Sequence, residues 1–298
     1  MTSMAFIRGD GLRKVYDPEG TAVEALHNVN FSIERGEFVS ILGPSGCGKS
    51  TLLMMCGGLE DISDGLLVVA GSPMTGPRRD VGVMFQDPTL LPWKTVLENV
   101  LFPARIARIP IEPVEQRARA LLQSVGLQSF ESHRPHQLSG GMRQRVSICR
   151  ALVNDPSILL MDEPFSALDA ITRDQMNVLL LDLWQQQVAR TALFITHSIR
   201  EAVLLSDRIL VMTKRPATIV EDVKVLFSRP RTPGLAEQPE FNQLCGHLRS
   251  MIEHNLGGRR VPHPRGRLAG GAQIWFRPAS RRKRADSRRL HYHMPWKS

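Results

Sequence analysis

The chain has 298 residues, 42% of them hydrophobic and 22% charged, which is the composition of a folded globular protein with one large or two small domains. The net charge is +9, but residues 257–298 hold 12 basic residues and one acid, and the other 26 basic and 28 acidic residues give −2, which excludes a uniform nucleic-acid-binding surface. No apolar run approaches the roughly 18 residues of a membrane-spanning helix and the N-terminus has no signal pattern, so we expect a soluble, cytosolic protein.

Residues 5–33 predict antiparallel strands, at Phe6-Ile7, at Leu12–Tyr16 and at Val23–Ile33. Tyr16 lies at the end of the second of these strands. A lone tyrosine in a strand commonly packs half-buried, and the alternative is a platform that stacks on an adenine ring.

A glycine-rich loop separates the predicted strand Phe38–Leu42 from a predicted helix that begins at Lys49. Backbone N–H groups in such a loop turn inward and bind phosphate oxygens, and the N-terminus of the helix adds positive potential. Lys49 would reach the β- and γ-phosphates of a nucleotide, and the Ser50 hydroxyl would bind Mg²⁺. The loop consists of Gly43, Pro44, Ser45, Gly46, Cys47, Gly48, Lys49, Ser50 and Thr51. Because Cys47 lies inside the loop, we expect alkylation of its thiol to block nucleotide binding.

Two short strands are predicted at Leu66–Ala70 and Val81–Phe85, and Gln86 follows the second. A glutamine at this position is either an ordinary polar loop residue or a functional one. In the second case its amide oxygen would join a Mg²⁺ shell and orient water.

Helical periodicity over residues 95–154 predicts an inserted helical subdomain. Ser139 precedes Gly140 and Gly141 there, and its hydroxyl is placed to cap a helix that continues through Gln144. A capped helix start with two glycines is either a plain helix cap or a second anion-binding site.

The apolar run Ile158–Met161 predicts a strand that is buried on both faces, and Asp162 and Glu163 follow it. Open α/β sheets bind ligands at the carboxyl ends of such strands. Asp162 would hold Mg²⁺ through water, and Glu163 would polarise an attacking water molecule. Solvated strand caps are the alternative, and the phosphate-binding loop argues against it.

The second half of the chain predicts alternating helices and strands. After the turn Ser166–Asp169 comes a helix at 171–187, and the buried strand Thr191–Thr196 ends at His197. A lone histidine is commonly structural, but beside a γ-phosphate it would position water. The later elements are a helix from Ile199, strands at Asp207–Thr213 and Thr218–Val225, and a helix at Phe241–Leu256. Beyond Gly257 apolar periodicity is absent and we expect disorder.

In this order the motifs resemble those of the ATP-binding-cassette (ABC) ATPases over roughly residues 5–255. They are Tyr16, Gly43–Thr51, Gln86, Leu138–Gln144, Ile158–Glu163, Ser166–Asp169 and His197. The resemblance implies an α/β fold, a P-loop NTPase core of ABC type with an antiparallel β subdomain and an inserted helical subdomain. The implied segments are 1–94 for the first part of the core with the β subdomain, 95–154 for the helical subdomain, 155–256 for the rest of the core, and 257–298 for a basic tail.

The resemblance also implies ATP and Mg²⁺ as cofactors and a head-to-tail dimer. Each ATP would lie between the phosphate-binding loop of one subunit and the capped helix start of the other. The implied contacts on the second subunit are Ser139, Gly140, Gly141 and Gln144. The implied catalytic residues are Glu163, His197 and Gln86, and the implied metal residues are Ser50, Gln86 and Asp162. This site requires Lys49 and Glu163 to lie close enough to share one magnesium-bound triphosphate.

Within the family, the stretches Phe85–Trp93, Ser206–Met212 and Arg215-Pro216 are similar to those of bacterial importers for nitrate, sulfonates and taurine. This similarity implies a peripheral ATPase at the cytoplasmic face of the bacterial inner membrane. Its partners would be integral membrane permease subunits, a second ATPase subunit and, indirectly, a solute-binding protein. A short cytoplasmic helix of the permease would dock in a groove beside Gln86.

Some positions depart from the family pattern. Ser198 follows His197 where Asp is frequent, and Ser63-Asp64 replaces a customary Pro. The basic tail has no counterpart in this group. It is a solvated extension, a segment that docks on anionic lipid or nucleic acid, or the product of a shifted reading frame, and the mass of the natural product would test the last of these.

The alternative function is an ABC-type ATPase of DNA repair or chromosome maintenance. Such proteins carry long coiled-coil or zinc-binding insertions between the two halves of the cassette, and this chain has neither. Translation-associated members carry two cassettes in one chain, and an exporter would need a separate membrane polypeptide. An importer ATPase is therefore the favoured function, and binding to nucleic acid is not expected.

Overall fold

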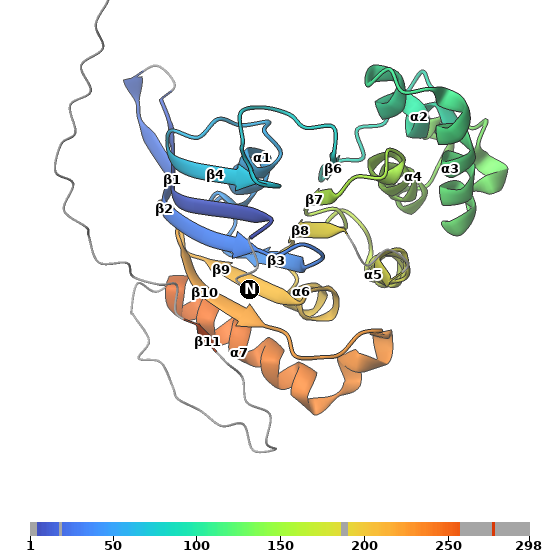
Figure 1. Ribbon diagram of the computed structural model, residues 1–298. Helices are drawn as coiled ribbons and strands as arrows, with labels where there is room; N and C mark the ends of the chain where they lie inside the picture. Colours follow the sequence, from blue (N-terminus) through green and yellow to red (C-terminus); the bar gives the residue numbers. More distant parts are fainter. Residues whose placement is uncertain (1–4, 18–19, 186–189, 257–275, 278–298) are drawn as a thin grey trace, which may run out of the picture.

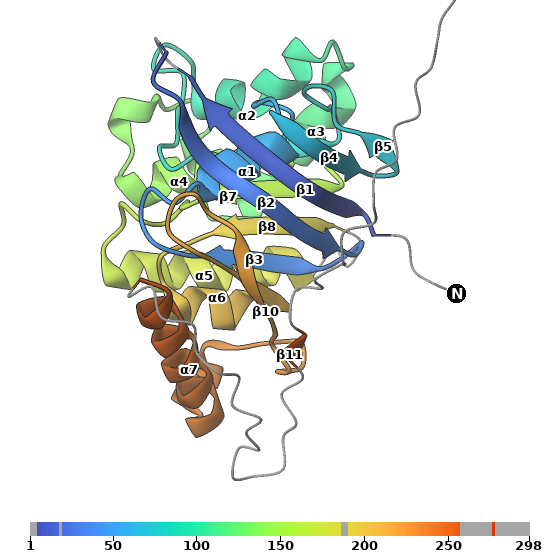
Figure 2. The ribbon, with the colours of Figure 1, turned by 90° about the vertical axis from the view of Figure 1, so that its left-hand side faces the viewer.

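The computed structural model describes residues 5–17, 20–185, 190–256 and 276–277, and they form two β-sheets with helices around them (Figure 1). A four-stranded antiparallel sheet has the order β2-β1-β4-β5, and a seven-stranded mixed sheet has the order β11-β10-β9-β3-β8-β7-β6. Figure 2 shows the antiparallel sheet lying over one face of the mixed sheet. The predicted combination of a parallel core sheet with an antiparallel β subdomain is confirmed.

The antiparallel sheet is built on one long strand where two were expected. Its strands are β1 (Ile7–Tyr16), β2 (Val23–Ile33), β4 (Asp64–Val69) and β5 (Ser72–Pro73). The β1–β2 register shifts between Gly9 and Leu12, so the segment that lacks apolar alternation is a bulge within one strand. A side chain at Gly9 would lie 2.6 Å from the ring of Phe31, which explains why glycine interrupts the pattern.

The mixed sheet has five parallel strands, as the uninterrupted apolar runs predict. In sheet order they are β9 (Arg208–Met212), β3 (Phe38–Leu42), β8 (Thr191–Ile195), β7 (Ile158–Asp162) and β6 (Val81–Met84). The antiparallel strand β10 (Ile219–Lys224) pairs with β9, and β11 (Phe276–Arg277) pairs with β10. Apart from β11, the expectation of disorder beyond Gly257 lies outside the described residues.

Two hydrophobic cores lie on opposite faces of the mixed sheet, and the central strand β3 contributes side chains to both. Val39 and Ile41 belong to the core shared with the antiparallel sheet and with α1 (Lys49–Cys56). Phe38 and Leu42 belong to the core on the other face, which the remaining helices cover. All five residues of β3 are buried, so the loop that follows Leu42 starts from a fixed position.

The helices on the second face form two groups (Figure 1). In one, α2 (Val96–Ile106) packs on α3 (Ile111–Ser124) and on α4 (Gly140–Leu152), within the segment where helical periodicity was found. In the other, α6 (Ile199–Leu205) contacts α5 (Ala170–Gln185) and α7 (Pro239–Leu256). The predicted helices are present with ends shifted by a few residues, and residues 186–187 of the predicted helix 171–187 lie outside the described part.

Candidate functional site

The phosphate-binding loop connects β3 to α1 and depends on glycines in the left-handed region. Gly46 has φ 70° and Gly48 has φ 117°. A side chain at Gly48 would also lie 2.9 Å from Leu26 and 3.3 Å from the carbonyl oxygen of Ala25. Because both the conformation and the space require glycine, the backbone N–H groups of this loop can approach a ligand closely.

Lys49 lies under the loop with 5% of its surface exposed. Its ammonium group donates to the carbonyl oxygens of Gly43 and Pro44, each at 3.0 Å. The Nζ atom is 4.0 Å from Oε1 of Glu163. Lys49 and Glu163 therefore lie as close together as one shared triphosphate requires, and the condition derived from the sequence is met.

Ser50 and Asp162 meet at the start of α1 and the end of β7. The Ser50 hydroxyl donates to Oδ1 of Asp162 at 3.0 Å. Burial raises the pKa of the Asp162 carboxyl, with the negative charge of Glu163 adding to the effect and Ser50 and Lys49 opposing it. This pair combines oxygen ligands with a partly desolvated carboxylate that a cation would stabilise, so it fits a Mg²⁺ ion.

Glu163 follows Asp162 in a left-handed backbone conformation, with φ 43°. Its N–H donates to the carbonyl oxygen of Ile195 at 3.0 Å, across from β7 to the end of β8. Oε2 of Glu163 is 3.4 Å from Nδ1 of His197. A non-glycine residue in this conformation is uncommon and clusters at functional sites. The carboxylate of Glu163 therefore lies between Lys49 and His197.

Tyr16 reaches the same helix from the antiparallel sheet. Its hydroxyl is 3.3 Å from the hydroxyl of Thr51 on α1, and the ammonium group of Lys14 lies 4.8 Å from the ring centroid. The ring thus stands beside the phosphate-binding loop, where an adenine platform would be needed. Packing and stacking both remain compatible with this position.

Gln86 leaves the mixed sheet beside the carboxylates. Strand β6 pairs in parallel with β7, with Met84 opposite Met161. Gln86 and Glu163 each lie two residues beyond these partners, at the same edge of the sheet. Within the described residues, Gln86 is exposed, and no hydrogen bond joins its side chain to the other site residues. Arg150 holds the segment after it, donating to the carbonyl oxygens of Pro88 at 2.6 Å and Thr89 at 2.8 Å.

Ser139 caps α4 as predicted, since its hydroxyl accepts the N–H of Met142 at 3.2 Å. Ser139 and Gly140 are exposed, whereas Gly141 packs so closely on α5 that a side chain there would lie 2.7 Å from Thr172. The side chain of Gln144 is 3% exposed and therefore does not share this surface. Among the described residues, no hydrogen bond or ion pair joins this helix start to the phosphate-binding loop of the same chain.

Cys47 is a buried residue of the phosphate-binding loop. The side chain is 1% exposed and belongs to the core between the sheets. Burial raises the pKa of its thiol, and the nearby cations Lys49 and Arg215 only partly oppose this. The thiolate is the species that reacts with alkylating agents, so burial slows alkylation of Cys47, and the effect of alkylation on nucleotide binding stays a prediction.

Sequence reasoning missed other side chains that support the site. Arg215, in the segment after β9, donates from Nε to the carbonyl oxygen of Gly46 at 3.1 Å. Arg173 and Glu201 lie behind Glu163 and His197, and Arg173 donates to the backbone of the turn that follows Glu163. The sequence analysis used Arg215-Pro216 only as a similarity to importers, and it did not predict that Arg215 contacts the phosphate-binding loop.

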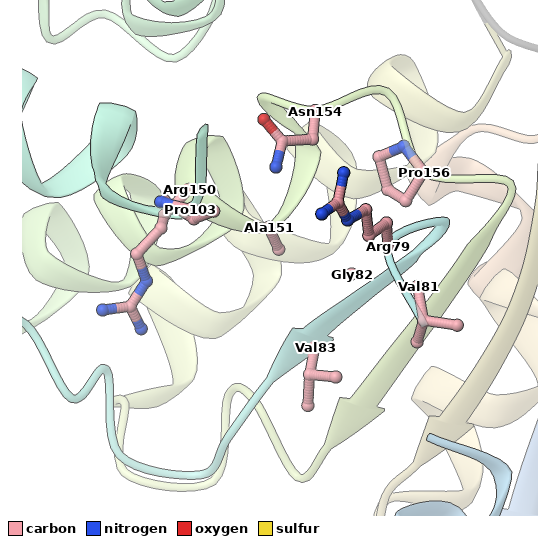
Figure 3. Close-up of a pocket in the computed structure, with 9 residues that line it drawn as sticks. All are labelled: Arg79, Val81, Gly82, Val83, Pro103, Arg150, Ala151, Asn154 and Pro156. Atoms are coloured by element: carbon pink, nitrogen blue, oxygen red, sulfur yellow. The ribbon is translucent and has the colours of Figure 1, made fainter. Parts of the chain in front are cut away.

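A cavity of about 100 Å³ lies away from the loop, between β6 and the helices α2 and α4 (Figure 3). Its lining includes Arg79, Gly82, Pro103, Arg150, Asn154 and Pro156. Arg150 is also the residue that holds the segment after Gln86. The cavity is therefore connected to the site through that segment.

The arrangement suits transfer of a phosphoryl group from a nucleotide to water. Amides and Lys49 are placed for the phosphates, Ser50 and Asp162 for a cation, and Glu163 and His197 for the attacking water. Among the described residues there is no group of three or more His, Cys, Asp or Glu side chains that would hold a metal alone.

Comparison with known proteins gives consistent matches. The family described as "ABC transporter" matches residues 26–166. An uncharacterised ABC transporter ATP-binding protein of Methanocaldococcus jannaschii is 47% identical, over 80% of this chain and 88% of that protein. The taurine import ATP-binding protein TauB of Burkholderia pseudomallei is 44% identical, over 81% of this chain and 94% of that protein.

Two further similarities come from an importer subunit and a solved structure. The aliphatic sulfonates import ATP-binding protein SsuB of Bacillus thuringiensis is 40% identical, over 81% of this chain and 93% of that protein. The dimeric structure of an ATP-binding cassette in a post-hydrolysis state, bound to ADP and Pi, matches with a TM-score of 0.66 and 34% identity. That match covers 74% of this chain and all of the other.

Proposed function

The chain belongs to the ABC transporter family of ATP-binding proteins, and on that premise we propose that it is the ATP-hydrolysing subunit of an importer for taurine or a related sulfonate. The observation that carries the proposal is the carboxylate of Glu163, 4.0 Å from Lys49 and 3.4 Å from His197 at the mouth of the phosphate-binding loop. No finding supports the alternative of a nucleic-acid-associated ATPase.

The loop binds the phosphates of ATP, and Lys49 is its mobile cation. In the structure its ammonium group bonds two loop carbonyls, and on ATP binding it would turn to the β- and γ-phosphates. Glu163 then accepts a proton from water as the water attacks the γ-phosphorus, and His197 holds the γ-phosphate and the water in line. Gln86, at the neighbouring strand end, orients the same water.

A bound Mg²⁺ ion would supply positive charge beside the phosphates. Ser50 and Asp162 would hold it, since their oxygens already converge at 3.0 Å, and Gln86 would contribute its amide oxygen. The negative charge that Asp162 gains by ionising would be stabilised by the ion, which offsets the effect of its burial.

A second copy would complete each nucleotide site. The exposed start of α4 at Ser139 and Gly140 has free N–H groups and a helix dipole that favour an anion. We place it against the γ-phosphate of the partner subunit, so that two ATP molecules join the two chains and hydrolysis loosens the dimer. The dimeric cassette with ADP and Pi supports this arrangement.

The permease would dock beside the segment after Gln86. Trp93 is 67% exposed and Ile106 is 69% exposed, and the cavity of Figure 3 lies between α2, α4 and β6. Trp93 carries the argument, because large aromatic side chains are enriched at protein–protein interfaces. Among the described helices, none is long and apolar enough to cross a membrane. The import ATP-binding proteins among the relatives support a place for the chain at the cytoplasmic face of the bacterial inner membrane, on a separate permease that a solute-binding protein loads.

Purification of the full chain from its native membranes tests the proposal. We expect an integral membrane permease to co-purify with it, and the complex in proteoliposomes to hydrolyse ATP faster with a loaded binding protein. Taurine, an alkanesulfonate and nitrate would be compared as solutes. Stoichiometric DNA or ribosomes, in place of a permease, would contradict the importer function.

A further inference from the structure

A partly buried ion pair lies behind the two residues that are placed for attack on ATP. Arg173 on α5 and Glu201 on α6 approach each other, with Nε 3.7 Å from Oε1. Glu201 is 6% exposed, and its Oε2 accepts the hydroxyl of Thr196 at 2.5 Å. Asn177 also bonds to this carboxylate. The pair therefore connects α5, α6 and the end of β8.

Arg173 holds the turn that carries Glu163. Its guanidinium group donates to the carbonyl oxygens of Phe165 at 3.2 Å and Leu168 at 2.8 Å. The N–H and hydroxyl of Ser166 in the same turn donate to the carbonyl oxygen of Glu163, at 3.2 Å and 2.9 Å. A displacement of Arg173 would thus be transmitted to the backbone of Glu163, which already occupies an uncommon conformation.

Glu201 holds the segment that carries His197. The Thr196 hydroxyl donates to Glu201 and accepts the N–H of Ser198 at 2.9 Å. The residues on both sides of His197 are therefore tied to one carboxylate. The two ends of the ion pair thus control the two residues whose side chains meet at 3.4 Å.

A helix cap does not account for these contacts. In a capping box, the glutamate at the third helical position bonds the N–H of the N-cap residue. Here Ser198 caps α6 through the N–H of Glu201, but its own N–H goes to Thr196, and the Glu201 carboxylate goes to Thr196 and Arg173. The Glu201 end of the pair is buried, whereas 28% of the Arg173 side chain is exposed. Because burial of the carboxylate carries a desolvation cost, the pair brings little net stability, and its best-supported use is to specify a geometry.

We propose that Arg173 and Glu201 are positioning residues for ATP hydrolysis, which set the separation of Glu163 and His197. The inference rests on the proposed function, because it assigns both residues to the attack on ATP. Neither side chain touches the nucleotide. The pair acts through the turn after Glu163 and through Thr196.

The test is a double-mutant cycle with the full chain, measured as kcat and KM for ATP and as Kd for a fluorescent ATP analogue. Glu201→Gln keeps the shape of the side chain and removes its charge. We expect kcat to fall by about tenfold to a hundredfold, as for other small misplacements of reacting groups, with Kd changed by less than about twofold. Thr196→Val, which removes one hydroxyl, should lower kcat in the same sense and covers the case in which Glu201→Gln folds poorly.

The decisive comparison is the background of His197→Ala, with radiolabelled ATP to follow slow turnover. If Glu201 acts through His197, Glu201→Gln should cost less than about twofold there. An equal loss in both backgrounds would reveal a general structural role and overturn the inference. Glu115→Gln, which removes an exposed partner of Arg119 on α3, is the matched control and should leave kcat unchanged. Absence of turnover in the unmodified chain would instead refute the proposed function, and this inference with it.

Discussion

Two glycine-rich helix starts in this chain have similar local chemistry and different surroundings. The start of α1 carries Lys49 itself, and Asp162, Glu163 and His197 are brought to it from other parts of the chain. The start of α4 is exposed at Ser139 and Gly140. A helix N-terminus attracts an anion in both places. The carboxylates and the histidine that are placed for hydrolysis come from the ends of parallel strands, beside the first helix start. The second helix start has the anion-binding end of a helix and offers a binding surface.

Of the changes at the first helix start, removal of the proposed general base should have the largest effect on ATP turnover. Glu163→Gln keeps the volume of the side chain and loses the proton acceptor, so we expect ATP turnover to fall by about a thousandfold. ATP binding should persist, because the loop and Lys49 are unchanged. An ATP-loaded dimer should then accumulate and be visible by size-exclusion chromatography. Turnover at the unmodified rate would disprove the assignment of Glu163.

Removing the ammonium group of Lys49 should weaken ATP binding at the first helix start. Lys49→Ala deletes the charged donor to the phosphates, and we expect Kd for ATP to rise by about a hundredfold, from the loss of charge-assisted hydrogen bonds. Isothermal titration calorimetry measures it. Lys224→Ala, an exposed lysine on β10, is the matched control and should bind ATP normally. Equal affinity in both variants would mean that the loop does not hold the phosphates.

Blocking the second helix start should impair turnover with little loss of ATP binding by the single chain. In Ser139→Arg a bulky cation replaces the cap, and we expect turnover to fall by at least about tenfold through loss of contacts to the partner's phosphate. Mixing this variant with Lys49→Ala should restore activity, to about a quarter of the unmodified rate with random exchange of subunits, because one site in each mixed dimer is intact. No recovery on mixing would argue against a shared site.

Much of the fold and of the site could be predicted because the signals are local. The loop from Gly43 to Thr51 and the capped helix at Ser139 each lie within about ten residues, and buried strands read as apolar runs. The bulge that joins both halves of β1 was missed, because the need for glycine at position 9 comes from a steric contact with Phe31 on another strand. The burial of Cys47 and the pairing of Arg173 with Glu201 likewise depend on packing between distant segments, which periodicity does not reveal.

The smallest expected effect is a change in the free energy of unfolding, caused by Asp162 beside the first helix start. Burial holds the pKa of Asp162 above its ordinary value, so ionisation of this carboxyl disfavours the folded state without a bound cation. At neutral pH, Asp162→Asn should therefore raise the free energy of unfolding by on the order of 0.5 kcal/mol. The sign follows from linkage: below the unfolded pKa the carboxyl is neutral in both states, so the gain should shrink as the pH falls through the folded pKa. Urea unfolding at pH 7 and in mild acid measures it, with the exposed Asp182→Asn as control. A loss of stability at pH 7 would show that the hydrogen bond from Ser50 stabilises the folded state by more than the burial of the carboxylate destabilises it. The first helix start would then carry no electrostatic cost at Asp162.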